Sequence, residues 1–64
     1  MKAFGYEVKG SRKLTGDLRS ALSKGEIINW NLFNTGDSYY TRNCDEFEVK
    51  EADHENKIIV LKEI

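Results

Sequence analysis

The chain has 64 residues, of which 39% are hydrophobic and 33% charged, with no proline and one cysteine. This length allows one domain, near the lower limit for a hydrophobic core without disulfides or metal, and the composition excludes a disordered tail and an internal disulfide framework. The net charge of −1 hides an asymmetry, because six basic and two acidic residues give residues 1–24 a charge of +4, while residues 25–64 carry −5. Such a split is typical of two electrostatic faces, or of two halves that neutralise each other.

The N-terminal residues 2–8 predict a first strand. Phe4, Tyr6 and Val8 share one parity, while smaller or charged residues occupy the other. Strict alternation of this kind is typical of a strand with one face toward the core. We therefore expect these three side chains to be buried.

A helix is predicted next. Its apolar face consists of Leu14, Leu18, Ala21 and Leu22. Thr15 is the preferred N-cap, and Ser11 would begin the helix a turn earlier. Gly25 is placed to end it in the left-handed conformation. A helix of about ten residues is marginal by itself, so its leucines must dock on the sheet.

Residues 26–42 hold the only tryptophan, and their pattern predicts a β-hairpin. Apolar and polar residues alternate up to the turn signal Asn34-Thr35-Gly36-Asp37, where Gly36 can take the positive φ of a tight turn. Trp30 then points toward the core. The opposite face is a mixed aromatic and polar surface that includes Asn29, Asn31, Phe33, Tyr40 and Arg42.

The C-terminal third predicts two more strands. Phe47 and Val49 lie on one side of the first of these, which follows a turn at Asn43-Cys44-Asp45. After a second turn at Asp53-His54-Glu55-Asn56, the last segment, residues 57–64, is apolar on both parities for four residues, which is typical of a strand covered on both faces or placed centrally. We expect this last strand to pair with its predecessor and also with the first strand.

Together these elements predict a single α+β domain over residues 1–64. One helix packs on a four- to five-stranded, mainly antiparallel sheet in the order β-α-β-β-β-β, either open or curled into a small barrel. The predicted core consists of Phe4, Tyr6, Val8, Leu14, Leu18, Leu22, Ile28, Trp30, Leu32, Phe47, Val49, Ile58 and Val60.

The outward hairpin face and the acidic strand after it are the strongest candidates for a binding surface. Aromatic residues and arginine are favoured at protein interfaces, and a row of acids can meet a basic partner. The predicted partner-binding residues are Asn31, Phe33, Tyr40, Arg42, Glu46 and Glu48. Two plainer interpretations stay open: the helix covers this face, or the acids are the solvated side of an edge strand that resists aggregation.

A nucleic-acid-binding surface is the alternative. Basic residues flank the start of the helix, where cations can contact phosphates, and the hairpin aromatics could stack on bases. The residues for this role are Lys9, Arg12, Lys13 and Arg19. The chain lacks the spacing of a phosphate-binding loop, and its overall acidity favours protein over nucleic acid as the partner.

Catalysis is not expected. His54 and Cys44 fall in no catalytic motif and lack the paired spacing of a zinc site, so we predict no enzyme activity, cofactor or metal. His54 is expected to be a solvent-exposed turn residue. Glu7 and Lys9 interrupt any signal-peptide core, and no run is long enough to span a bilayer. With a single cysteine, this predicts a cytoplasmic protein without membrane contact.

In size and lack of catalytic groups the chain resembles the small accessory proteins of phages and mobile elements, which often bind and block a host protein. The leading hypothesis is therefore a non-catalytic protein-binding module, an inhibitor or adaptor that acts as a monomer or homodimer. The acidic strand points to a basic or nucleic-acid-handling host protein as its partner.

Overall fold

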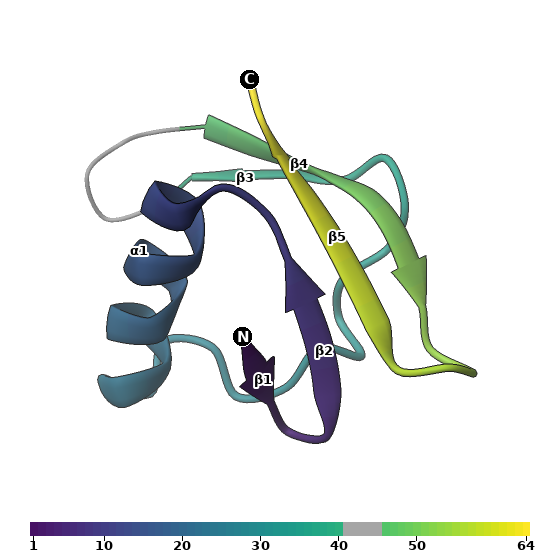
Figure 1. The fold of residues 1–64 in the computed structure, drawn as a ribbon, viewed down its shortest axis with the longest axis horizontal. Helices are drawn as coiled ribbons and strands as arrows, with labels where there is room; N and C mark the ends of the chain where they lie inside the picture. The colour runs from purple at the N-terminus through teal and green to yellow at the C-terminus, as the bar shows by residue number, and fades with distance from the viewer. Residues whose placement is uncertain (41–45) are drawn as a thin grey trace.

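The computed structural model describes residues 1–40 and 46–64, over which the chain forms one helix and five strands (Figure 1). In chain order these are β1 (Lys2–Ala3), β2 (Tyr6–Lys9), α1 (Arg12–Ser23), β3 (Ser38–Tyr40), β4 (Glu46–Asp53) and β5 (Ile58–Glu63). The predicted α+β class is confirmed. The predicted element order is wrong in one respect, because two strands precede the helix and three follow it.

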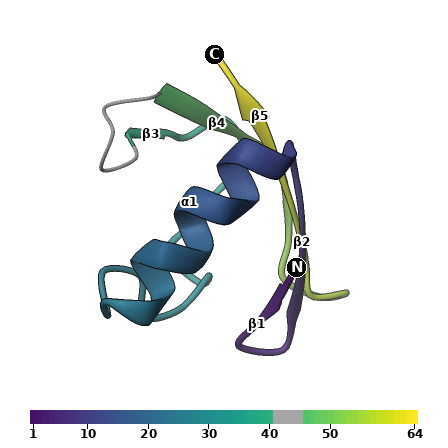
Figure 2. The same ribbon diagram turned by 60° about the vertical axis from the view of Figure 1, so that its left-hand side comes forward.

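The sheet is open and mixed, with the strand order β1-β2-β5-β4-β3. β5 is the central strand, parallel to β2 and antiparallel to β4, which confirms the placement predicted from its two-sided apolar sequence. The short strands β1 and β3 form the edges, so the sheet does not close into a barrel. Figure 2 shows α1 and the loop after it on one side of β2 and β5, with the other side of these strands uncovered.

A tight turn at Phe4 and Gly5 breaks the predicted first strand in two. Their φ angles of 51° and 81° let β1 fold back on β2, so that Ala3 lies opposite Tyr6. Phe4 is therefore 56% exposed at the tip of this turn, and its predicted place in the core is wrong. A two-residue turn with positive φ at both central positions favours Asn-Gly, because a bulky L-residue is sterically disfavoured there.

Replacing Phe4 with asparagine should therefore stabilise the domain. We expect the free energy of unfolding to rise by about 1 kcal/mol, since asparagine adopts the left-handed conformation at a lower steric cost. Urea denaturation followed by tryptophan fluorescence measures this change. Phe4→Ala is the matched control, because it removes the same ring but keeps the backbone preference unfavourable. A Phe4→Asn protein no more stable than Phe4→Ala would contradict the argument.

The helix begins at Ser11, the earlier of the two predicted starts. The Ser11 hydroxyl oxygen accepts a hydrogen bond from the Leu14 amide at 3.1 Å, as an N-cap does, and donates one to a Glu63 carboxylate oxygen at 2.8 Å. The second bond ties the start of α1 to the end of β5. Gly25, with a φ of 73°, follows the end of the helix as predicted.

The core lies between the covered face of the sheet, α1 and the loop after it. It consists of Tyr6, Val8, Leu14, Leu18, Trp30, Phe33, Phe47, Val49, Ile59 and Leu61. In β5 the buried side chains are Ile59 and Leu61, whereas the prediction placed Ile58 and Val60 there. Both parities of this strand are apolar, so its sequence could not select one. Its partners select it, because Leu61 lies opposite the buried Val49.

Over residues 26–40, the described part of the predicted hairpin, the chain does not form that hairpin. From residue 26 to residue 37 the chain is turns and irregular structure, and β3 pairs with β4 instead of with a strand around Trp30. The turn itself is real: Asp37 donates to the Asn34 carbonyl at 3.1 Å, and Gly36 has a φ of 92°. It leads into the β3–β4 pairing. The turn predicted at residues 43–45 lies outside the described residues.

Candidate functional site

An apolar groove of about 430 Å³ opens between α1, the irregular segment of residues 26–37 and β3. Leu18 and Ala21 line it from the helix, Ile28 and Leu32 from the irregular segment, and Tyr40 from β3. We call this site the α1–β3 groove. It is the candidate functional site because its rim combines apolar side chains with high exposure.

Three rim side chains of the groove remain mostly in water: Ile28 is 67% exposed, Leu32 65% and Tyr40 71%. The predicted burial of Ile28 and Leu32 is wrong, because an irregular segment does not alternate its side chains as a strand does. Single exposed apolar residues are ordinary, whereas several around one concave surface are typical of a binding site. Asn29, Asn31 and Asn34 gave only a weak sequence signal for this irregularity, because asparagine is depleted in strands and favours turns, but their alternation with apolar residues also fits a strand.

Trp30 anchors the irregular segment and thereby shapes the groove. Its side chain is fully buried, and its Nε1–H donates to the Ala3 carbonyl of β1 at 3.0 Å. The indole packs edge-on against Phe33 with ring centroids 4.8 Å apart, and Phe33 stacks on Tyr39 at 4.6 Å. The predicted inward orientation of Trp30 is thus confirmed, although the element that carries it is not a strand.

His54, which directly follows β4, also holds the irregular segment against the sheet. Its Nε2 lies 2.7 Å from the Phe33 carbonyl oxygen, and its Nδ1 lies 2.9 Å from the Tyr6 hydroxyl, which donates to Asn31 Oδ1 at 2.9 Å. A carbonyl oxygen only accepts hydrogen bonds, so Nε2 carries a proton. The prediction that His54 is solvent-exposed is therefore wrong, because its side chain is half-buried, with Nε2 donating to the Phe33 carbonyl and Nδ1 next to the Tyr6 hydroxyl.

A β-bulge in β4 brings His54 to this position. The pairing with β5 shifts between Val49 and Glu51, so that Val49 lies opposite Leu61 but Ala52 lies opposite Ile59. The extra residue moves the inward parity of β4 from odd to even numbers. His54 shares the new inward parity. Simple alternation from Phe47 and Val49, which ignores the bulge, places it on the outer face.

The structure divides the predicted partner-binding residues into separate groups. Phe33 is 6% exposed, so the prediction that it faces a partner is wrong. Asn31 is exposed but bonded to Tyr6. Tyr40 lies directly opposite Glu46, on the other face of the sheet from Tyr39 and the buried Phe47. Arg42 lies outside the described residues.

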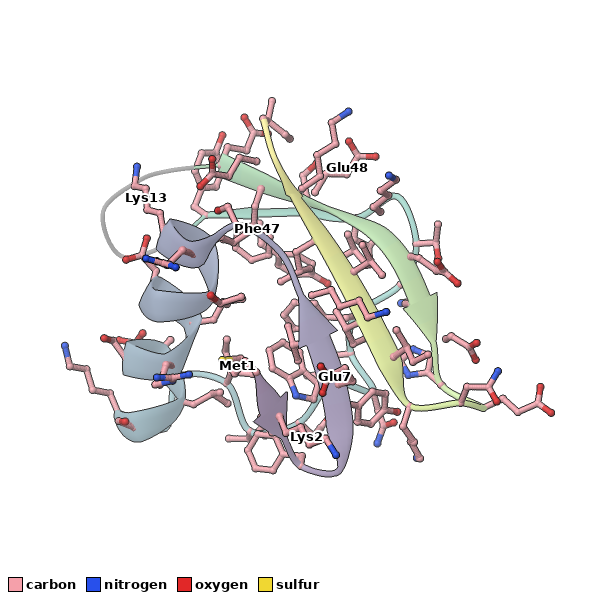
Figure 3. The ribbon with its side chains drawn as sticks, viewed as in Figure 1. Met1, Lys2, Glu7, Lys13, Phe47 and Glu48 are labelled. Atoms are coloured by element: carbon pink, nitrogen blue, oxygen red, sulfur yellow. The ribbon has the colours of Figure 1, made fainter. Side chains whose placement is uncertain are left out.

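The acidic and basic candidate residues occupy different parts of the molecule. Glu48 lies on β4, paired across the sheet with Lys62 of β5 and with Ser38 of β3. The four basic candidates are exposed at the end of β2 and along α1: Lys9, Arg12, Lys13 and Arg19. Figure 3 shows Lys13 at the upper left beside α1 and Glu48 near the top, above β4 and β5.

Tyr39 sits where the groove meets β3 and has an altered pKa. Its hydroxyl donates toward the Leu32 carbonyl at 3.1 Å and lies 3.3 Å from an Asp37 carboxylate oxygen. Burial, followed by the charge and hydrogen bond of Asp37, raises the pKa of the Tyr39 phenol above its ordinary value. The neutral phenol therefore stabilises the fold, and this contribution is lost as pH rises through the folded-state pKa.

A spectrophotometric titration tests this assignment. The tyrosinate absorbance of the native protein should include a component that ionises above the ordinary range, and Tyr39→Phe should remove that component. Asp37→Asn should move it only part of the way back, because burial is the largest cause. If the component with the highest pKa were still present in Tyr39→Phe, the prediction would be contradicted.

The described part of the chain shows no cluster of three His, Cys, Asp or Glu side chains that could hold a metal. Over residues 1–40 and 46–64, no helix is long and apolar enough to cross a membrane. Comparison of the chain with protein-family models, with characterised proteins and with solved structures finds no match.

Proposed function

We propose that this protein is a non-catalytic protein-binding module, a small inhibitor or adaptor, which engages its partner through the α1–β3 groove. The observation that carries the proposal is the exposure of Ile28, Leu32 and Tyr40 around one apolar groove of about 430 Å³. Covering these side chains removes apolar surface from water, which is worth about 25 cal/mol per Å². A partner with apolar side chains of matching shape would gain this energy.

The surroundings of the groove favour a partner with basic groups outside its apolar contact. Tyr40 belongs both to the groove rim and to the sheet face away from Phe47, where it lies opposite Glu46. Interfaces combine an apolar centre with a polar rim, and complementary charge at the rim sets orientation and association rate. The acids of β4 fit this role, and the proposed partner is therefore a basic protein.

Leu32→Ser tests the proposal, because the side chain is 65% exposed and its loss should leave the fold intact. We expect the substitution to weaken partner binding at least tenfold, about 1.4 kcal/mol. The partner is first recovered by photo-crosslinking from a probe amino acid placed at position 28, and its affinity is then measured by calorimetry.

Ile64→Ser is the matched control, since Ile64 is 66% exposed but does not line the groove. It should bind as the native protein does. Equal binding by Leu32→Ser and Ile64→Ser would contradict the assignment of the groove as the binding site. A failure to recover any crosslinked protein would contradict the proposed function itself.

Nucleic-acid binding is the second candidate, favoured by the exposure of Lys9, Arg12, Lys13 and Arg19. It is the weaker one, because Phe33, one of the aromatics needed for base stacking, is buried. It predicts binding to DNA or RNA that weakens steeply with salt, since released counterions drive such binding. The absence of any mobility shift at about 50 mM salt would exclude it.

A further inference from the structure

Among residues 1–40 and 46–64, no strand lies beside one edge of β3. β3 is the last strand in the order β1-β2-β5-β4-β3, and Figure 2 shows it at the margin of the sheet, beyond β4. An edge strand presents backbone N–H and C=O groups that another extended chain can pair with. β3 also contributes Tyr39 and Tyr40 to the α1–β3 groove, so this free edge and the groove adjoin each other.

The hydrogen-bond pattern identifies which backbone groups point outward. The Val49 amide donates to the Asp37 carbonyl at 2.8 Å, and Tyr39 lies opposite Phe47 two residues further along. In an antiparallel pair, hydrogen-bonded positions alternate with positions whose backbone groups point away. Tyr39 is therefore bonded to β4, whereas the N–H and C=O groups of Ser38 and Tyr40 point to the free edge. The described residues provide no partner for these outward groups.

We propose that the groove takes an extended peptide segment of the partner, which pairs with the free edge of β3 as an additional strand. Two N–H donors and two C=O acceptors, from Ser38 and Tyr40, are available to it. This inference rests on the proposed function and specifies the form of the partner. Addition of a strand to a sheet edge is an established mode of peptide recognition, in which backbone bonds give affinity and side-chain pockets give specificity.

The two faces of the added strand meet different surroundings. Residues of one parity point to the covered side of the sheet and enter the groove between Leu18 of α1 and Leu32, where they must be apolar. Residues of the other parity point to the opposite side, where Ser38 is small and the carboxylate of Glu48 lies behind it. Lysine or arginine fits there. The peptide is therefore expected to alternate apolar and basic residues with a period of two.

A display library of random peptides, each of about ten residues and thus long enough for one strand, provides the probe. The library is selected on the 64-residue protein, immobilised through its surface lysines. Enriched sequences should show apolar residues at alternate positions with basic residues between them. Enrichment of apolar residues at a spacing of three and four would indicate a helix in the groove and would overturn the inference while leaving the proposed function in place. No enrichment at all would overturn both.

Ser38→Pro tests the backbone contact on the protein side. Proline removes the outward N–H of position 38 and places its ring on the free edge, but leaves the bonds between Tyr39 and β4 in place. We expect Ser38→Pro to weaken an enriched peptide at least tenfold, and Ser38→Ala, which keeps the N–H, to weaken it less than twofold. Equal affinity for the two variants would overturn strand addition.

A second measurement keeps the test valid if Ser38→Pro does not fold. N-methylation of single amides along the enriched peptide should weaken binding at alternate positions, because only every second amide of an added strand faces β3. Uniform tolerance of N-methylation would overturn the inference, since it would show that backbone donors of the peptide make no contact.

Discussion

Replacing Phe33 with serine should unfold most of the protein at room temperature. Phe33 is 6% exposed and lies between the rings of Trp30 and Tyr39. The substitution therefore opens a cavity and buries a serine hydroxyl that has aromatic rings around it. Such changes in a core cost about 3–5 kcal/mol, which is comparable to the whole stability of a domain of this size. Far-ultraviolet circular dichroism across a urea titration measures the loss.

Tyr40→Ser is the matched control for this prediction. It removes an aromatic ring only seven residues away, but this ring is 71% exposed, so the free energy of unfolding should change by less than about 0.5 kcal/mol. A Phe33→Ser protein as stable as Tyr40→Ser would contradict the burial of Phe33 and would restore the hairpin face that the sequence predicts.

Replacing Trp30 with alanine should have an effect of the same size or larger. The side chain is fully buried and closes the core between the irregular segment and β1. The substitution removes the largest apolar side chain of the core and leaves the Ala3 carbonyl without its indole donor, which together cost about 4–5 kcal/mol. We expect differential scanning calorimetry to show no cooperative unfolding transition, because most of the chain is already unfolded.

Trp30→Phe separates packing from hydrogen bonding at this position. Phenylalanine keeps most of the aromatic contact with Phe33 but has no donor for the Ala3 carbonyl, so the loss should be about 1–2 kcal/mol and the protein should remain folded. If Trp30→Phe were as damaging as Trp30→Ala, then the hydrogen bond to β1, and not the volume of the ring, would hold the irregular segment in place.

Phe33 and Tyr40 show why the candidate site differs from the predicted one. The sequence places Phe33 and Tyr40 together on an outward hairpin face, whereas the fold buries the first and exposes the second. The rim of the groove instead uses Ile28 and Leu32, which the prediction assigned to the core. Within residues 26–37, Ile28 and Leu32 are therefore exposed instead of buried, and Phe33 is buried instead of exposed. Trp30 is buried as predicted.

The cause of this reversal is tertiary packing and not local preference. The edge of β3 that the predicted hairpin would use has no neighbouring strand among the described residues, because residues 26–33 lie against the core, where Trp30 and Phe33 are buried. The backbone of the irregular segment is satisfied instead by individual contacts, such as His54 to the Phe33 carbonyl and Tyr39 to the Leu32 carbonyl. None of these contacts leaves a periodic trace in the sequence.

The sequence by itself determined the features that depend on neighbouring residues. Helical spacing of leucines gives α1, the Ser11 cap and Gly25 mark its limits, and the two-sided apolar run gives the central position of β5. Tertiary structure alone decided which parity of β5 is buried, where β4 bulges, and that residues 26–37 are irregular. Periodicity reports which residues can share a face, but only the packing of distant elements decides which face is covered and which is left open for a partner.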